Sequence, residues 1–235
     1  MKSKKQKRNL RDRFGTLLFI TLVLSVIYSL VRSFLAPDVA PADSEFMHVK
    51  SDYMLMFLQC SLGLVVLGLP SLVTRKWNLT LPNFIYILYY IFLYCAIFLG
   101  EVFAFYYLVP FWDSILHFFS GAMLGALGFI LVSWLNDAKI RGLSLSPAFV
   151  ALFAFCFALS CGVVWEIYEY TFDGLLGLNM QKFVTASGEV LAGREALSDT
   201  MKDIIVDALA AGLIAIIGFF RLCAVKKELP EAAKN

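Results

Sequence analysis

The chain contains little charge. Only 16% of its 235 residues are Asp, Glu, Lys or Arg, whereas 60% are hydrophobic. A soluble globular protein is usually about 45–50% apolar. The net charge is only +2, and the basic residues are concentrated in a few places, so no nucleic-acid partner is expected. Together with a mean hydropathy of +0.76, the composition indicates a polytopic membrane protein.

Familiar catalytic motifs are also missing. The sequence contains no Walker, Rossmann, nucleophile-elbow or HExxH pattern. Its five cysteines are odd in number, have no CxxC spacing and lie mostly in apolar runs, so we interpret them as small core residues without a disulfide or metal role. These are Cys60, Cys95, Cys156, Cys161 and Cys223. A soluble catalytic domain of a known type is therefore excluded.

What the chain does have is long apolar runs, and a helix needs about 20 such residues to cross a bilayer. Six runs qualify, at residues 14–35, 53–73, 84–109, 113–135, 147–172 and 199–220. We predict an all-α polytopic membrane protein, a six-helix transmembrane bundle over residues 14–220. A basic flank at residues 1–13 precedes it, and a tail at residues 221–235 follows it.

The basic residues predict the orientation. When the connections between spans are assigned alternately to two sides, one side receives 15 of the 20 Lys and Arg residues, including both ends of the chain. Cytoplasmic segments carry such an excess, so both termini are predicted to be cytoplasmic. The residues from Val39 to Ala42 would also pass as a signal-peptide processing site, and cleavage there would leave the later topology unchanged.

Ionisable residues gather at one end of the last three spans. Asp199, Asp203 and Asp207 follow one another at intervals of four, so they share a helix face, which continues into Ala211 and Ala215. A carboxylate in hydrocarbon costs at least ~2.5 kcal/mol and needs something that offsets this cost. The last span is therefore expected to place its acids against a partner.

The two preceding spans repeat this pattern. Asp113 and His117 lie four residues apart ahead of Gly121 and Gly125, and a stripe of Ala154, Ala158 and Gly162 leads to Glu166, with Glu169 one turn further. Small residues at such spacing let membrane helices pack closely. We therefore expect the polar ends of the three helices to converge.

Each residue has a simpler interpretation when it is taken alone. Asp113 and Asp199 stand where helix N-caps belong, His117 would be a hydrogen-bonded helix residue, and Glu101 in the third span would be an isolated polar packing residue. Taken together, several carboxylates in a low-dielectric pocket repel one another unless protons or a cation neutralise them. A divalent metal site (Mn²⁺, Mg²⁺, Fe²⁺ or Zn²⁺), a proton or cation relay and a structural polar cluster all stay open.

These motifs carry a family resemblance. The segment from Trp112 to Phe118 with Gly121, then Trp165-Glu166-Ile-Tyr-Glu169, then Asp199-Thr-Met-Lys-Asp203 resembles the YjdF-type family of bacterial inner-membrane proteins, which is similar in motif layout to VanZ-like proteins. The resemblance covers roughly residues 100–218. It implies a multi-pass protein of the bacterial inner membrane with shared polar positions, and Asp207 falls outside the motif, at a position where a small or apolar residue is expected. Those shared positions are Asp113, His117, Glu166, Glu169, Asp199 and Asp203.

The sequence thus leads to one principal hypothesis and two rivals. The principal one is a metal site that opens to the outer leaflet, with Asp113, His117, Glu166, Asp199 and Asp203 as ligand candidates and Glu169 as general acid or base. Such a site would act as a hydrolase or transferase on an amphipathic or lipid-linked envelope substrate. The rivals are a proton- or cation-coupled transporter and a non-catalytic membrane scaffold.

Overall fold

The structure of the chain is a computed structural model, and it describes residues 2–38, 47–77, 80–135, 145–185 and 188–232. These residues are almost all helical. They contain no β-strand, only an isolated bridge between Val184 and Val190. The proposed processing site from Val39 to Ala42 lies outside the described residues.

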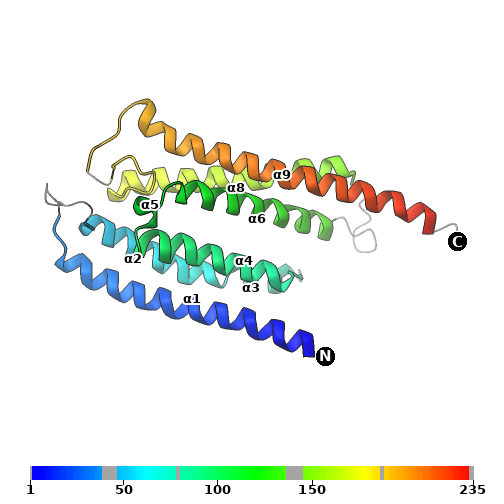
Figure 1. Cartoon of the computed structure of the whole chain (residues 1–235), viewed down its shortest axis with the longest axis horizontal. Coiled ribbons are helices and arrows are strands. Elements are labelled where there is room, and N and C mark those ends of the chain that lie inside the picture. Colours follow the sequence, from blue (N-terminus) through cyan, green and yellow to red (C-terminus); the bar gives the residue numbers. More distant parts are fainter. Residues whose placement is uncertain (1, 39–46, 78–79, 136–144, 186–187, 233–235) are drawn as a thin grey trace. The chain divides into compact units, whose positions relative to one another are not determined.

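Six stretches are long and apolar enough to cross a membrane, which confirms the predicted number of spans. The described residues form nine helical elements, eight of which make up these stretches, while the short α5 lies between the third and the fourth (Figure 1). These elements are α1 (Lys2–Leu35), α2 (Lys50–Leu67), α3 (Leu69–Trp77), α4 (Asn83–Leu93), the π-helix η1 (Tyr94–Val102), α5 (Phe105–Leu108), α6 (Trp112–Leu135), α8 (Pro147–Leu176) and α9 (Arg194–Ala232).

Several boundaries differ from the predicted ones. Helix α1 includes the basic segment from Lys2 onward, and α9 begins at Arg194, so Asp199 lies inside the helix and the N-cap interpretation of Asp199 is wrong. Asp113 does lie in the first turn of α6. The loop predicted at residues 173–198 shrinks to 177–193, because α8 continues to Leu176.

Local sequence signals account for the ends of α8. The Ser146 side chain accepts a hydrogen bond from the backbone N–H of Phe149 at 3.2 Å, and Pro147 occupies the first helical position, where its missing N–H costs nothing. At the other end Gly177 has a φ of +65°, and its N–H donates to the carbonyl of Asp173 at 3.0 Å. A glycine in this conformation is a common helix stop.

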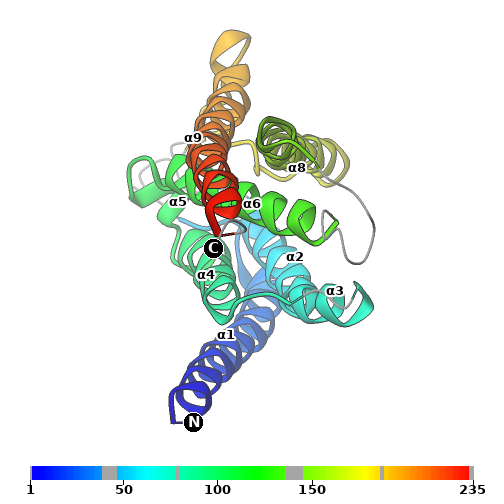
Figure 2. The same ribbon diagram turned by 90° about the vertical axis from the view of Figure 1, so that its right-hand side faces the viewer.

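The chain divides into two compact units, and α6, α8 and α9 each contribute to both. Unit 1 comprises Met1–Leu116 and Glu169–Asp199. Within it α1 packs along α2 and α4, as both views of the ribbon show (Figures 1 and 2). Its core is formed by the buried side chains of Leu18, Leu22, Tyr53, Met56, Cys60, Leu93 and Ile97.

Unit 2 comprises His117–Tyr168 and Thr200–Asn235, and small residues bring its helices together. A Cβ at Gly121 would lie 3.2 Å from the Cα of Asp207 on α9, and one at Gly128 would lie 2.8 Å from the Cα of Ala154 on α8. Ala154 and Ala211 have no exposed surface. The predicted small-residue stripes therefore do face neighbouring helices, as close packing of membrane helices requires.

The cysteines are free, as the spacing predicted, but they are not uniformly part of the core. Cys60 is buried, whereas Cys156 is exposed on α8 and the others are partly exposed. The interpretation of the cysteines as core residues is therefore correct for Cys60 and wrong for Cys156. Small apolar side chains on a membrane helix are as acceptable on the lipid side as inside, so an apolar run alone does not distinguish the two.

Candidate functional site

Unit 2 contains a buried group that we call the histidine cluster: His117 on α6, Glu166 on α8, and Asp203 and Asp207 on α9. All four side chains belong to residues less than 9% exposed. The Nδ1 atom of His117 forms a hydrogen bond with Oδ2 of Asp207 at 3.2 Å, and the Nε2 atom lies 3.7 Å from Oε1 of Glu166. The imidazole ring therefore stands between two carboxylates.

The hydrogen bond to Asp207 determines the chemistry of the ring. When Asp207 is ionised it can only accept, and in that state Nδ1 carries the proton of the bond and Nε2 of the neutral ring keeps its lone pair. Histidines that bind metals usually donate their second N–H to a carboxylate or carbonyl in this way. Nε2 of His117 is thus prepared to be a ligand atom.

The distance between His117 and Glu166 is also compatible with a metal site. A separation of 3.7 Å between Nε2 of His117 and Oε1 of Glu166 exceeds hydrogen-bond range. Two ligand atoms on one ion, with bonds of about 2.0–2.2 Å, lie at most about 4.4 Å apart. This separation is therefore compatible with one ion bound by both residues.

Further ligand atoms lie within reach on α6 and α9. His117 and Asp203 each offer a ligand atom within 4.8 Å of the other, and Asp113, one helical turn before His117 on α6, offers a carboxylate oxygen within the same distance of the histidine ligand atom. Asp203 is 3% exposed and Asp113 is half-buried. The i, i+4 spacing of Asp113 and His117 thus gives the proximity that the sequence predicted.

Charge balance makes the cluster unusual. Its three buried acids carry three negative charges when ionised, against at most one positive charge on the imidazole. Among the described basic residues of unit 2, every side chain with an assigned burial is exposed. These are Lys202, Arg221, Lys226 and Lys227. Protons or a bound cation are two ways in which the repulsion among such acids is offset.

Glycine provides the space for this arrangement. A Cβ at Gly162 on α8 would overlap the Oδ2 atom of Asp207, the same atom that bonds to His117. Gly121 allows the backbone of Asp207 to approach α6. The position of the Asp207 carboxylate therefore depends on the absence of a side chain at residue 162.

The predicted site residues do not all belong to this cluster. Asp113, Glu169 and Asp199 lie in unit 1 and are half-buried. Asp207, which the family resemblance left outside its motif, is the most buried acid, at 2% exposure, and it contacts the histidine directly. Its place in the Asp199, Asp203, Asp207 series is the sequence signal that could have identified it as a site residue.

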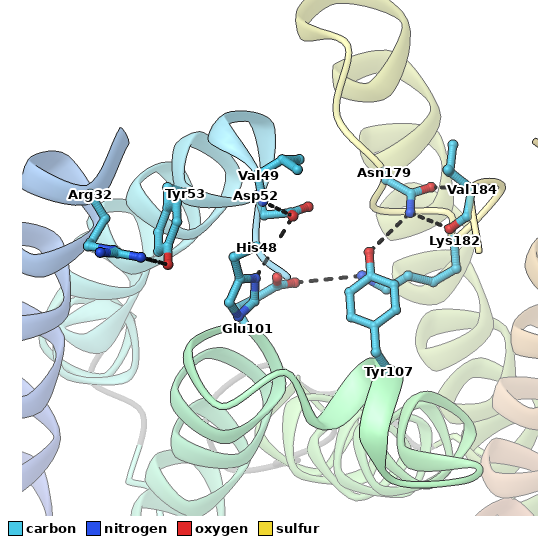
Figure 3. Close-up of polar contacts among 10 residues, drawn as sticks. All are labelled: Arg32, His48, Val49, Asp52, Tyr53, Glu101, Tyr107, Asn179, Lys182 and Val184. Carbon is cyan, nitrogen blue, oxygen red and sulfur yellow. Dashed lines mark hydrogen bonds and ion pairs between the residues drawn. The ribbon is translucent and has the colours of Figure 1, made fainter. Parts of the chain in front are cut away.

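Unit 1 contains a second polar group, which we call the lysine cluster: Glu101 on η1, Tyr106 and Tyr107 on α5, and Lys182 in the α8–α9 connection. Figure 3 shows Glu101, Tyr107 and Lys182. The Nζ atom of Lys182 lies 4.0 Å from Oε1 of Glu101, and 4.6 and 5.1 Å from the ring centroids of Tyr106 and Tyr107. Glu101 is therefore paired with a cation and is not an isolated packing residue.

The groups around Lys182 favour its charged form. Burial alone would lower the pKa of Lys182, but Glu101, Tyr107, Asp113 and Glu169 act in the opposite direction, and the pKa is raised above its ordinary value. Burial also raises the pKa of Tyr107. Lys182 is therefore a fixed cation and not a nucleophilic amine.

The fold and the histidine cluster together define a polytopic helical membrane protein with a buried carboxylate–histidine site. The chain belongs to the family described as predicted membrane protein (DUF2238), whose model matches residues 14–224. A protein of Thermotoga maritima, described as uncharacterized, is 32% identical over 120 residues, which are 51% of this chain and 53% of that protein. The chain thus aligns with about half the length of this relative. No solved structure matches the chain.

Proposed function

We propose that the protein is a membrane metalloprotein in which the histidine cluster binds a divalent cation. The observation that carries this proposal is the pair of distances at His117: a hydrogen bond of 3.2 Å between Nδ1 and Asp207, and a gap of 3.7 Å between Nε2 and Glu166. The first arrangement orients a metal-ligating histidine, and the second is compatible with two atoms that share an ion.

In this proposal each residue of the chain has a separate role. His117, Glu166 and Asp203 hold the ion, Asp113 adds a carboxylate from the preceding turn of α6, and Asp207 fixes the imidazole ring. Mn²⁺, Mg²⁺, Fe²⁺ and Zn²⁺ all accept such ligands. The group of ligand atoms around His117 includes those of Asp113 and Asp203, so Asp199 is the weakest of the ligand candidates.

A bound divalent ion would supply Lewis acidity, which hydrolases and transferases use. Glu169, one turn of α8 beyond Glu166, is our candidate for the general acid or base that moves the proton. The substrate we propose is amphipathic, such as a lipid-linked envelope precursor, because the site lies in a membrane-spanning protein. The resemblance to YjdF-type and VanZ-like proteins and the distribution of basic residues support a bacterial inner-membrane location with both termini in the cytoplasm.

The first test is metal content. The protein is purified in detergent, equilibrated separately with each of the four ions, freed of excess metal and measured by inductively coupled plasma mass spectrometry. We expect the wild type to retain an ion and the variant with His117→Ala and Asp203→Asn to lose it, while Glu189→Gln, which neutralises an exposed acid, behaves as the wild type. Near-zero metal in the wild type with all four ions would refute the proposal.

Proton or cation transport is the second candidate, because both ring nitrogens of His117 face carboxylates, as in a relay. It is distinguished by uptake into proteoliposomes. Uptake that is present in the wild type, absent in Glu166→Gln and accompanied by no retained divalent metal would favour transport over metal-dependent chemistry.

A further inference from the structure

The lysine cluster links the α8–α9 connection to the helices of unit 1 by more than the ion pair. The side-chain amide of Asn179 donates hydrogen bonds to the hydroxyl of Tyr107 at 3.1 Å and to the carbonyl of Val184 at 2.7 Å (Figure 3). The backbone N–H of Val184 donates back to Asn179 at 2.9 Å. We call residues 178–185 the lid segment, because they dock on α5 and η1 through these contacts.

The lid segment is internally ordered around the lysine. The carboxylate of Asp173 accepts hydrogen bonds from the backbone N–H groups of Met180 and Gln181 at 2.8 and 2.9 Å. Leu178 and Met180 are buried. The segment therefore presents Lys182 from a defined turn, and it would move as a unit if the ion pair opened.

Backbone strain is concentrated at this contact. Among the described residues, three non-glycine residues have a positive φ, and all three lie in unit 1. Two of them border the lysine cluster: Lys182 itself, with a φ of 50°, and Ala104, with a φ of 57°, between η1 and α5. Side chains rarely adopt this conformation, and such residues are typical of switch regions.

The helix that carries Glu101 is not α-helical. Residues Tyr94–Val102 form a π-helix, which contains one residue more per turn than an α-helix needs. Conversion of η1 to α-helical register would rotate the residues that follow by about 100°. Glu101, the penultimate residue of η1, would then turn away from Lys182.

We propose that Glu101 and Lys182 form the latch of a lid, in which the lid segment docks on η1 and α5 while the ion pair is intact and lifts when Glu101 is neutralised or turned away. This inference does not depend on a metal in the histidine cluster. The titratable groups that act on Lys182 are Glu101, Tyr107, Asp113 and Glu169, and Glu101 forms an ion pair with it at 4.0 Å.

Trypsin can test the latch, because it must bind an accessible lysine. The Lys182 side chain is 15% exposed, whereas Arg75 and Lys76 on α3 are exposed and serve as internal references. We expect Glu101→Gln to raise the rate of cleavage after Lys182 about tenfold or more, because proteolysis follows the population of the open form. Glu189→Gln, an exposed acid in the same connection, should leave the rate unchanged.

Hydrogen exchange identifies the segment that opens. In Glu101→Gln the amides of Met180, Gln181 and Val184 should exchange faster while those of α2 do not, and the charge swap of Glu101→Lys with Lys182→Glu should restore protection. An unchanged cleavage rate in Glu101→Gln would overturn the proposal. So would wild-type lid amides that exchange only together with the amides of α2, since the lid would then have no separate open state.

Discussion

The two polar clusters neutralise buried acids in different ways. In the lysine cluster one acid, Glu101, faces a permanent cation, Lys182, so the pair is balanced by the chain itself. In the histidine cluster three acids face one imidazole, and the described lysines and arginines of unit 2 whose burial is assigned are exposed. The first cluster therefore suits a contact that opens and closes, whereas in the second the acids outnumber the imidazole and a proton or a cation would offset their repulsion.

The clusters also share one feature, which is a glycine that makes room for a functional side chain. A Cβ at Gly162 would overlap the carboxylate of Asp207, and one at Gly100 would overlap the ring of Tyr106. Equivalent substitutions can therefore be made beside each cluster, and their effects should differ in kind.

The largest effect should come from filling the space beside Asp207. Gly162→Val should displace the carboxylate from His117 and destabilise the protein by about 3 kcal/mol, as overpacking of a tight site does. The midpoint of thermal unfolding in detergent measures this. Gly174→Ala, on the same helix with no atom within 4 Å of its Cβ, is the matched control and should not be destabilised. An equal loss in both variants would contradict the close packing described.

The second-largest loss of stability should come from breaking the ion pair between Glu101 and Lys182. Glu101→Gln or Lys182→Met alone should cost about 2 kcal/mol, because each leaves a buried charge or polar group without its partner. The double variant should cost clearly less than the sum of the two. A double-mutant cycle on thermal unfolding gives the coupling directly, and strict additivity would show that the two side chains do not interact.

Substitutions in the two clusters should differ in their effect on the metal affinity of the protein. Asp207→Asn should weaken metal binding by about 10–100-fold, because it removes the carboxylate that orients His117. Glu101→Gln, which also neutralises a buried acid, should change the affinity by less than about twofold, since non-coordinating sites contribute little. Titration of the metal-free protein with Mn²⁺, followed by electron paramagnetic resonance, measures both. Equal losses would remove the distinction drawn between the two clusters.

The loss of a single hydroxyl should be smaller. Tyr107→Phe removes the acceptor for the Asn179 amide and keeps the ring beneath Lys182, so the expected cost is about 1 kcal/mol. Tyr170→Phe, at a residue 71% exposed, should have no measurable effect on thermal unfolding. A loss at Tyr107 as large as that in Lys182→Met would mean that the hydrogen bond, and not the ion pair, holds the lid segment.

Alkaline pH should have the least effect on the lysine cluster. A raised pKa means that the stabilisation by Lys182 is present below the unfolded-state pKa of about 10.4 and is lost only as the pH rises through the higher folded-state value. Cleavage after Lys182, relative to cleavage at Arg75 and Lys76, should therefore stay constant from about pH 7 to 9. Metal binding by the histidine cluster should weaken toward acid pH, because its ligands must be deprotonated.

The sequence predicted well what depends on local pattern. Six spans followed from the length of the apolar runs, and the buried faces followed from intervals of four, as with Asp203, Asp207 and Ala211. The proximity of His117 to Glu166 followed from a shared position at the polar ends of their helices. These features need only helix periodicity and the cost of a charge in an apolar medium.

What the sequence did not reveal depends on contacts between distant residues. Lys182 lies in a connection without periodicity, 81 positions from Glu101, so nothing local indicated their pairing. The π-helix leaves no signal in the pattern of apolar residues of η1. The family motif leaves Asp207 out, although the residue lies on the same helix face as Asp203. Its hydrogen bond with His117 shows that it belongs to the cluster.

Helix α9 has a consequence for the bilayer in which the protein functions. Its 39 residues give a length of about 58 Å, roughly twice the ~30 Å thickness of a typical hydrocarbon layer. A helix of this length can adapt to a thinner or thicker membrane in two ways. It can change its tilt, or a different set of its residues can span the hydrocarbon layer, and neither change breaks a backbone hydrogen bond. Reconstitution into lipids of different acyl length should therefore leave α9 intact.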